Sequence, residues 1–203
     1  MSVPGRNRKP WKMRWIVVSI LLFIPVYTYL TLHFRRPGRA FAPYQDMRDR
    51  ADVVRLLKAG YHRVSIDASR PADATGEVGG PTLAAPGGLP DELRKTLVET
   101  PLLPLSVDTA SAAPTAVSGI DYPIALTYSI PDNKRQLSGA HLYEREGDIV
   151  IVADFERLGG GLLARYRDGN ALLDVPPGSL KPGRYRVTLV GEQASRSWTL
   201  TVR

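Results

Sequence analysis

Apolar and polar residues alternate with a period of two along the C-terminal part of the chain. The alternation is clearest over residues 124–130, 185–189 and 198–202, and it is typical of strands with one buried and one solvent-facing side. The run DIVIVADF at 148–155 is apolar on both faces, which favours a central strand. Further strands are predicted at 140–145, 162–167 and 171–175. Together these patterns predict an all-β domain of about seven short strands in residues 122–203.

A Pro-Gly corner precedes one of these strands. The stretch Leu180-Lys-Pro-Gly-Arg-Tyr185 resembles the L-x-P-G-x-Y corner of immunoglobulin-like and fibronectin type III-like domains. The resemblance covers only the last 82 residues, and the lack of cysteine points to the cysteine-free branches. It implies an Ig-like β-sandwich in which Tyr185 hydrogen-bonds back across the corner and Leu180 packs in the core. Leu180, Pro182, Gly183 and Tyr185 are therefore expected to fix the fold corner, and such a corner says little about function.

A period of three to four residues runs through 43–60 and predicts an amphipathic helix. Met47, Val54 and Leu57 recur at helical spacing, and Gly60 suits the position after a helix end. A short strand is expected at 61–67. The apolar face of this helix is expected to pack either on the protein's own C-terminal domain or on another subunit, and the sequence favours neither.

Residues 71–121 are rich in Pro, Gly and Ala and predict an extended segment, with a short helix near 90–98. The segment is either a mobile tether or a strap that lies on a partner. Leu102, Leu103 and Leu105 are oddly apolar for a free linker. The candidate partner contacts are accordingly Met47, Val54, Leu57, Leu102, Leu103 and Leu105.

The N-terminal part has a different pattern. Residues 15–34 contain no Asp, Glu, Lys or Arg, and a helix of this length crosses the ~30 Å hydrocarbon core. A cleaved signal peptide is the alternative, but the apolar run exceeds the usual ~7–15 residues. The pattern predicts a single-pass transmembrane helix in the inner (plasma) membrane, with the basic tail 1–14 in the cytoplasm and the C-terminal domain in the periplasm. The expected membrane-interface residues are Trp11, Trp15, Arg35, Arg36 and Arg39.

The charge of the chain is concentrated in the same region. Residues 1–45 hold eight of the 27 basic residues and none of the 20 acidic ones, so the net charge of +7 belongs to the N-terminal part. Nucleic-acid-binding domains carry a basic face on the folded domain. No nucleic-acid partner is therefore expected. The lack of cysteine excludes disulfides and thiolate catalysis.

The titratable residues suggest no catalytic, cofactor or metal site. His141 and Glu144 have a metal-like spacing, but on a strand they point to opposite faces. Asp132-Asn133, Asp154 and Asp168-Gly-Asn170 carry oxygen ligands of the calcium type, and turn formation explains the loop residues equally well. The glycines at 159–161 are not followed by Lys-Ser/Thr, as a P-loop would require. We expect no small-molecule substrate and no enzyme activity.

These patterns predict five regions: a tail at 1–14, a transmembrane helix at 15–34, a juxtamembrane helix and strand at 35–70, a strap or tether at 71–121 and a sandwich at 122–203. The function expected from them is a non-catalytic accessory subunit that docks onto and stabilises a larger membrane complex. Respiratory or photosynthetic complexes are natural hosts. The alternative is a stand-alone anchored periplasmic module that binds an envelope component or a soluble partner.

Overall fold

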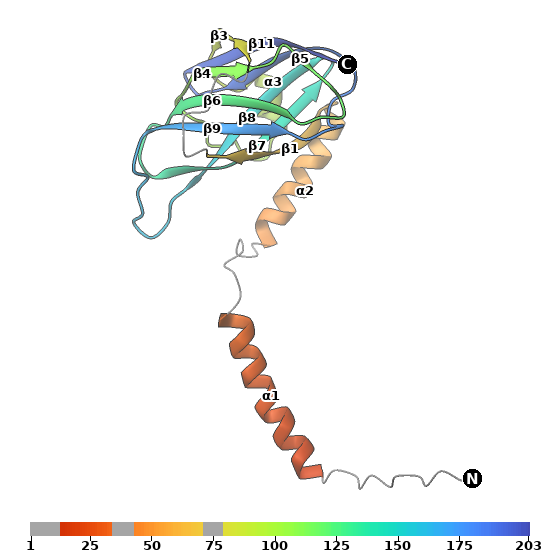
Figure 1. The fold of residues 1–203 in the computed structure, drawn as a ribbon, viewed down its shortest axis with the longest axis vertical. Coiled ribbons are helices and arrows are strands. Elements are labelled where there is room, and N and C mark those ends of the chain that lie inside the picture. Colours follow the sequence, from red (N-terminus) through yellow and green to blue (C-terminus); the bar gives the residue numbers. More distant parts are fainter. Residues whose placement is uncertain (1–12, 34–42, 71–78) are drawn as a thin grey trace, which may run out of the picture. The chain divides into compact units, whose positions relative to one another are not determined.

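The structure is a computed structural model that describes residues 13–33, 43–70 and 79–203. It divides into two compact units, Met1–Pro43 and Tyr44–Arg203. Helix α1 (Met13–His33) belongs to the first unit, and α2 (Pro43–Lys58) begins at the boundary (Figure 1). The remaining elements are β1 (His62–Ser69), β2 (Gly80–Pro81), β3 (Leu83–Pro86), α3 (Asp91–Thr96), β4 (Ser106–Ala112), β5 (Thr115–Ala116), β6 (Tyr122–Ser129), β7 (Arg135–Arg145), β8 (Asp148–Arg157), β9 (Asp168–Val175), β10 (Gly183–Val190) and β11 (Ala194–Val202).

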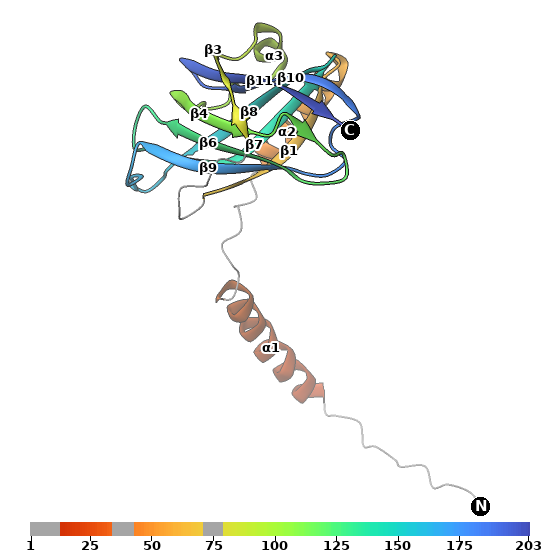
Figure 2. The same cartoon turned by 45° about the horizontal axis from the view of Figure 1, so that its top comes forward.

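Eight strands of the second unit close into a barrel. They follow one another in the order β4-β6-β9-β1-β7-β8-β10-β11, and β11 pairs back to β4 where Ala194 meets Ser106. The pairs β8–β10 and β4–β11 are parallel, and the other pairs in the ring are antiparallel. Strand β3 extends the sheet beyond β11 (Figure 2), and β2 extends it beyond β4. The fold is therefore a closed eight-stranded mixed barrel, extended by β2 and β3 and by the short strand β5, which pairs with β11.

The predicted immunoglobulin-like or fibronectin type III-like sandwich is wrong. A sandwich requires two separate sheets, whereas here β1 inserts between β7 and β9, and β4 links β6 to β11. Both inserted strands come from outside residues 122–203. The barrel therefore draws on more of the chain than the predicted domain, and their hydrogen bonds join the later strands into one ring.

The corner that suggested the sandwich nevertheless forms. The Tyr185 hydroxyl donates a hydrogen bond to the Lys181 carbonyl at 2.9 Å, and Leu180 and Tyr185 are both buried. A Cβ on Gly183 would lie in ordinary contact with the Tyr185 ring. The motif thus builds a tight entry to β10 in a fold that is not a sandwich.

Most of the predicted strands are present, with one exception. The alternating runs at 124–130, 185–189 and 198–202 lie in or next to β6, β10 and β11. The strand predicted at 162–167 is instead part of the loop between β8 and β9, and the Asp168-Gly-Asn170 turn lies inside β9. Leu162, Leu163 and Tyr166 of that loop are exposed, so the alternation of these residues does not mark a buried strand face.

The segment predicted to be extended contains regular elements. Residues 79–121 form β2, β3, α3, β4 and β5, while 71–78 lie outside the described residues. Val107, Ala110 and Ala112 of β4 are buried in the barrel. Small side chains fill these inward positions, so a strand rich in Ser, Thr and Ala resembles a linker in composition.

The barrel has an apolar interior and a second buried layer outside it. Ile149, Ile151 and Ala153 of β8 point into the interior core, whereas Val150 and Val152 belong to the second cluster. We call this second cluster the outer layer; its buried residues are Leu56, Tyr61, Leu89, Leu93, Leu97, Leu103, Tyr143, Val150, Val152 and Val190. Strand β8 is therefore covered on both faces, and this double burial explains its continuous apolar run. The prediction of a central strand at 148–155 is confirmed.

The described residues of the N-terminal unit do not support the predicted membrane anchor. Crossing a bilayer as a helix requires ~20 consecutive, predominantly apolar residues, and among the described residues no helix is long and apolar enough to do so. The predicted transmembrane helix at 15–34 and the single-pass location with a periplasmic domain are therefore wrong. Trp15 is exposed on α1, and Trp11, Arg35, Arg36 and Arg39 lie outside the described residues.

Candidate functional site

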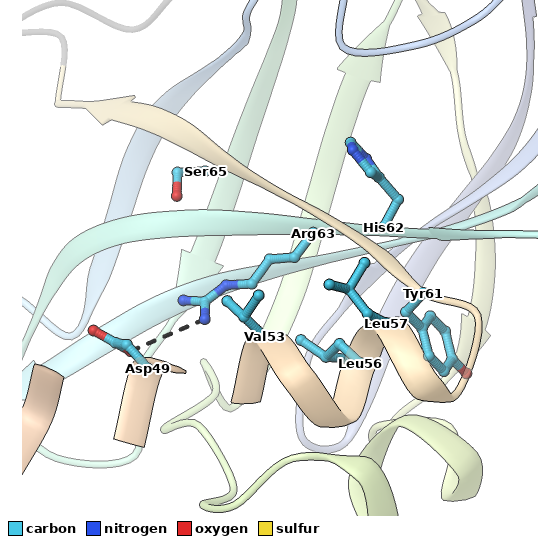
Figure 3. Close-up of a pocket in the computed structure, with 8 residues that line it drawn as sticks. All are labelled: Asp49, Val53, Leu56, Leu57, Tyr61, His62, Arg63 and Ser65. Carbon is cyan, nitrogen blue, oxygen red and sulfur yellow. Dashed lines mark ion pairs between the residues drawn. The ribbon is translucent and has the colours of Figure 1, made fainter. Parts of the chain in front are cut away.

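A groove of about 460 Å³ lies between α2 and β1. Figure 3 shows its two walls: Asp49, Val53, Leu56 and Leu57 project from α2, and His62, Arg63 and Ser65 come from β1, with Tyr61 at the connection. The α2 wall is mainly apolar, through Val53, Leu56 and Leu57, and Arg63 and Asp49 place opposite charges at one end. The groove is therefore amphipathic, as binding surfaces for other molecules commonly are.

The apolar surface of α2 is largely exposed: Met47 and Val54 point away from the barrel, and Val53 and Leu57 line the groove. Met47, Val53, Val54 and Leu57 are 65%, 44%, 52% and 63% exposed, whereas Leu56 is 1% exposed. At 100° per residue, Leu56 lies on the side of the helix opposite Met47 and Val54. A surface helix normally buries its apolar stripe. Here α2 buries one leucine and leaves four large apolar side chains accessible.

Short polar contacts fix α2 in this orientation. The Asp52 carboxylate accepts a hydrogen bond from the backbone N–H of Val98 at 2.6 Å, and Arg48 forms an ion pair with Glu99. Leu56 packs into the outer layer beside Tyr61 and the residues of β7 and β8. The inner side of α2 is thus occupied by contacts with its own domain, and the outward face is the side left for other molecules.

A polar chain runs beneath the groove through four elements. On α2 and β1, Asp49 Oδ1 lies 4.0 Å from Arg63 Nη1. On β7, His141 Nε2 lies 2.6 Å from Arg63 Nη2 and 3.1 Å from Asp154 Oδ2 of β8. His141 accepts from Arg63 in one tautomer and donates to Asp154 in the other.

The hydroxyl of neighbouring Tyr143 has a pKa that is shifted by burial and by the charges around it. Burial raises the pKa of the Tyr143 hydroxyl well above its usual value, Arg63 lowers it in part, and the carboxylates of Asp154, Asp52 and Asp49 raise it further. At neutral pH the phenol is therefore uncharged, and Arg63 remains the positive group that faces the acids of α2 and β8.

The polar chain does not have the geometry of a nucleophile and its base. Ser65 lies opposite His141 in the β1–β7 register, which brings Ser, His and Asp near one another. His141 Nε2 is already engaged by Arg63 and Asp154, and Nδ1 is buried. Among the residues that the structure describes, none forms a hydrogen bond with the Ser65 hydroxyl. An activated serine requires that bond, so the arrangement is better suited to holding α2 on the barrel.

Metal binding has no structural support in the described part of the chain. It contains no group of three or more His, Cys, Asp or Glu side chains placed to hold an ion. His141 and Glu144 both lie on β7, three residues apart, and in a strand such residues face opposite ways.

The predicted partner contacts separate into two groups. Met47, Val54 and Leu57 are exposed on α2, and Leu57 lines the groove. Leu103 is buried in the outer layer and Leu102 packs against the interior core. The backbone of Leu105 bonds to Ser129 and Gln193. The leucines at 102, 103 and 105 thus cover the protein's own barrel.

Of the residues that line the groove, only Leu57 was among the predicted contacts. Val53, Arg63 and His141 illustrate why the others were missed. Val53 lies four residues before Leu57, so helical spacing alone was enough to find it. Arg63 and His141 are separated by 78 residues, and only the β1–β7 register brings them together. No local pattern carries that signal.

No family model matches the sequence, and neither a curated protein nor a solved structure matches the chain.

Proposed function

We propose that this protein is a non-catalytic accessory subunit that docks onto a larger protein complex through α2. The observation that carries the proposal is the exposed apolar surface of α2, in which Met47 and Val54 face outward and Val53 and Leu57 line the groove above β1. Contiguous apolar surface of this kind marks interaction sites in otherwise soluble folds. The barrel serves as a rigid platform that presents the helix.

The chemistry of α2 specifies the partner. Arg50, Arg55 and Lys58 are exposed on the helix, whereas the carboxylates of Asp49 and Asp52 face Arg63 and the Val98 amide. The outward surface is therefore apolar and basic. An amphipathic helix of the partner, with apolar residues at i, i+3, i+4 and i+7 and acidic residues on its flanks, complements it.

The test is the assembly state of the full chain in its native cells. The wild-type protein should migrate with an assembly larger than its own 22.3 kDa. The double variant Val54→Glu/Leu57→Glu should lose this association, because each substitution puts a carboxylate into the apolar contact. Native gel migration after mild extraction, with crosslinking before extraction, provides the measurement.

Leu83→Glu is the matched control. Leu83 is 72% exposed on the edge strand β3 and does not line the groove, so its variant should stay in the assembly. An unchanged assembly in the α2 double variant would refute docking through α2. A wild-type chain found only as a free monomer would favour the stand-alone binding module instead.

A further inference from the structure

A second and larger cavity opens where the loop between β8 and β9 leaves the barrel. Its volume is about 850 Å³, within the ~300–1,000 Å³ typical of small-molecule sites. The loop covers residues 158–167 and projects from the barrel in Figure 1, at the lower left, in blue-green. The cavity residues come from β4, β6, β7, β8, β9, the end of β1 and this loop, and none of them lines the α2–β1 groove.

The inner wall of the cavity is aromatic, and the outer wall combines two leucines with Tyr166. Tyr128 and Phe155 are buried and meet edge to face, with ring centroids 5.1 Å apart. In the loop, Leu162, Leu163 and Tyr166 are 65%, 64% and 65% exposed. Leaving three large apolar side chains in water beside an open cavity is unfavourable. An apolar ligand body between the two walls would cover them.

The loop is held at its base, and its glycine tip is closed by a hydrogen bond from the Leu162 amide to the Gly159 carbonyl at 3.2 Å. The Leu158 and Ala164 amides donate to the carbonyls of Lys134 and Asn133, at 2.7 and 2.6 Å. Gly160 and Gly161 have φ of 66° and 77°, a left-handed conformation that glycine adopts without strain. The outer wall is thus positioned by the turn between β6 and β7, while the glycine tip can adjust to an occupant.

Charges at the cavity favour an anionic head group. Arg70, Arg135 and Arg165 line it, against the carboxylates of Asp108 and Asp168. Arg135 also contacts Asp132 at 3.8 Å, and Asp108 accepts a hydrogen bond from Ser106 at 2.5 Å. Residues 157–167 include three arginines and no acidic residue. Arg70 donates one hydrogen bond to the Leu137 carbonyl at 3.2 Å and lies beside the Tyr128 hydroxyl, and Arg165 is stacked on Tyr166 at 5.2 Å. Because a guanidinium carries five N–H donors, both keep donors for a ligand.

We propose that this cavity binds a small amphipathic anion, a carboxylate attached to an aliphatic or aromatic body. The apolar part lies between Tyr128–Phe155 and Leu162–Leu163, and the carboxylate pairs with Arg70 and Arg165. Guanidinium groups suit this role because they bind carboxylates in a bidentate manner. The inference is independent of docking through α2.

The proposal is tested by equilibrium dialysis of the full chain with radiolabelled laurate, below the concentration at which laurate forms micelles. Laurate should bind saturably at one site per chain. Dodecanol and dodecyltrimethylammonium, which have the same aliphatic body with a neutral or a cationic head, should bind at least about tenfold more weakly, because a charge-assisted pair is lost.

Two variants distinguish this site from adventitious apolar binding. Arg70→Gln/Arg165→Gln should weaken laurate binding by about tenfold or more, and Leu162→Asp/Leu163→Asp should abolish it. All four residues are exposed, so circular dichroism should show an unchanged fold. Arg184→Gln, an exposed arginine of β10 outside the cavity, should bind as the wild type does. Equal binding of laurate and dodecanol, or unchanged binding by the arginine double variant, would overturn the proposal.

Discussion

Single side chains satisfy polar groups inside the barrel. Trp198 Nε1 donates to the Tyr122 hydroxyl at 3.0 Å, and that hydroxyl donates to the Ala113 carbonyl at 2.7 Å. Burial raises the pKa of Tyr122 to about 12, with the Trp198 hydrogen bond lowering it slightly. The protonated phenol therefore contributes stability that is fully present below the unfolded-state pKa of about 10 and is lost as the pH rises through about 12.

Replacing Tyr122 with Phe should lower the free energy of unfolding by about 1–3 kcal/mol, because the buried Trp198 Nε1 loses its acceptor and the Ala113 carbonyl its donor. Urea denaturation at neutral pH measures the change. Tyr166→Phe, on an exposed loop residue, should leave the midpoint unchanged. Equal stability of Tyr122→Phe and wild type would show that the chain of hydrogen bonds contributes nothing.

At the scale of elements, local patterns predict the strands well but not their neighbours. The helix at 43–60 is confirmed as α2, and the alternating runs give β6, β8, β10 and β11. Strand β4 was missed because small residues fill the inward positions Val107, Ala110 and Ala112. The outward apolar face of α2 was equally compatible with packing on the barrel. Its orientation depends on Leu56 and on distant Val98, which no local pattern connects.

Strand pairing also brings like charges together. Asp67 of β1 lies opposite Asp174 of β9. Burial raises the pKa of Asp174 above its usual value, and Asp121 and Asp67 raise it further. The ionised carboxylate therefore destabilises the folded state at neutral pH. This penalty disappears as the pH falls below the unfolded-state pKa, because Asp174 is then protonated in both states.

Asp174→Asn should consequently raise the melting temperature at about pH 7, and the gain should shrink towards zero at about pH 3.5, below the usual pKa of aspartate. Thermal unfolding followed by circular dichroism at the two pH values measures the difference. Glu192→Gln, at an exposed position in the turn between β10 and β11, serves as the control and should show no such gain. A gain for Asp174→Asn that is equal at both pH values would contradict the electrostatic origin.

At the scale of the whole molecule, the ring closes at the turn between β10 and β11. The Glu192 and Gln193 amides donate to the carbonyls of Pro104 and Leu105. A Cβ on Gly191 would lie 2.3 Å from the Ala194 carbonyl oxygen and 3.0 Å from the Val107 nitrogen. Only glycine allows the backbone of β4 to approach this closely.

Gly191→Ala should therefore destabilise the protein by about 1–3 kcal/mol, the usual cost of overpacking a tightly packed site. Chemical denaturation gives the free energy of unfolding. Gly119→Ala is the matched control, because a Cβ there meets no atom within 4 Å. If both alanine variants unfold at the same denaturant concentration, the close approach at Gly191 does not require glycine, and the prediction is wrong.

The sequence patterns did not predict that the sheet closes into a barrel. The corner at Leu180 and Tyr185 was predicted correctly as local geometry, but the same corner fits either a sandwich or a barrel. What decides between them is the pairing of β1 with β7 and β9 and of β4 with β6 and β11. The accessible part of the candidate site, on α2, followed from helical spacing, whereas the Arg63–His141–Asp154 chain required this pairing.

The position of β1 between two late strands has a consequence for how the chain folds. Its hydrogen-bonded neighbours are 78 residues away on β7 and 103 residues away on β9. At ~5–20 residues synthesised per second, β1 leaves the ribosome roughly 5–20 s before β9 is complete. Such long-range pairing gives a high contact order and slow folding. During synthesis both edges of β1 stay unpaired until β7 and β9 are available, and unpaired edges of this kind favour misassembly.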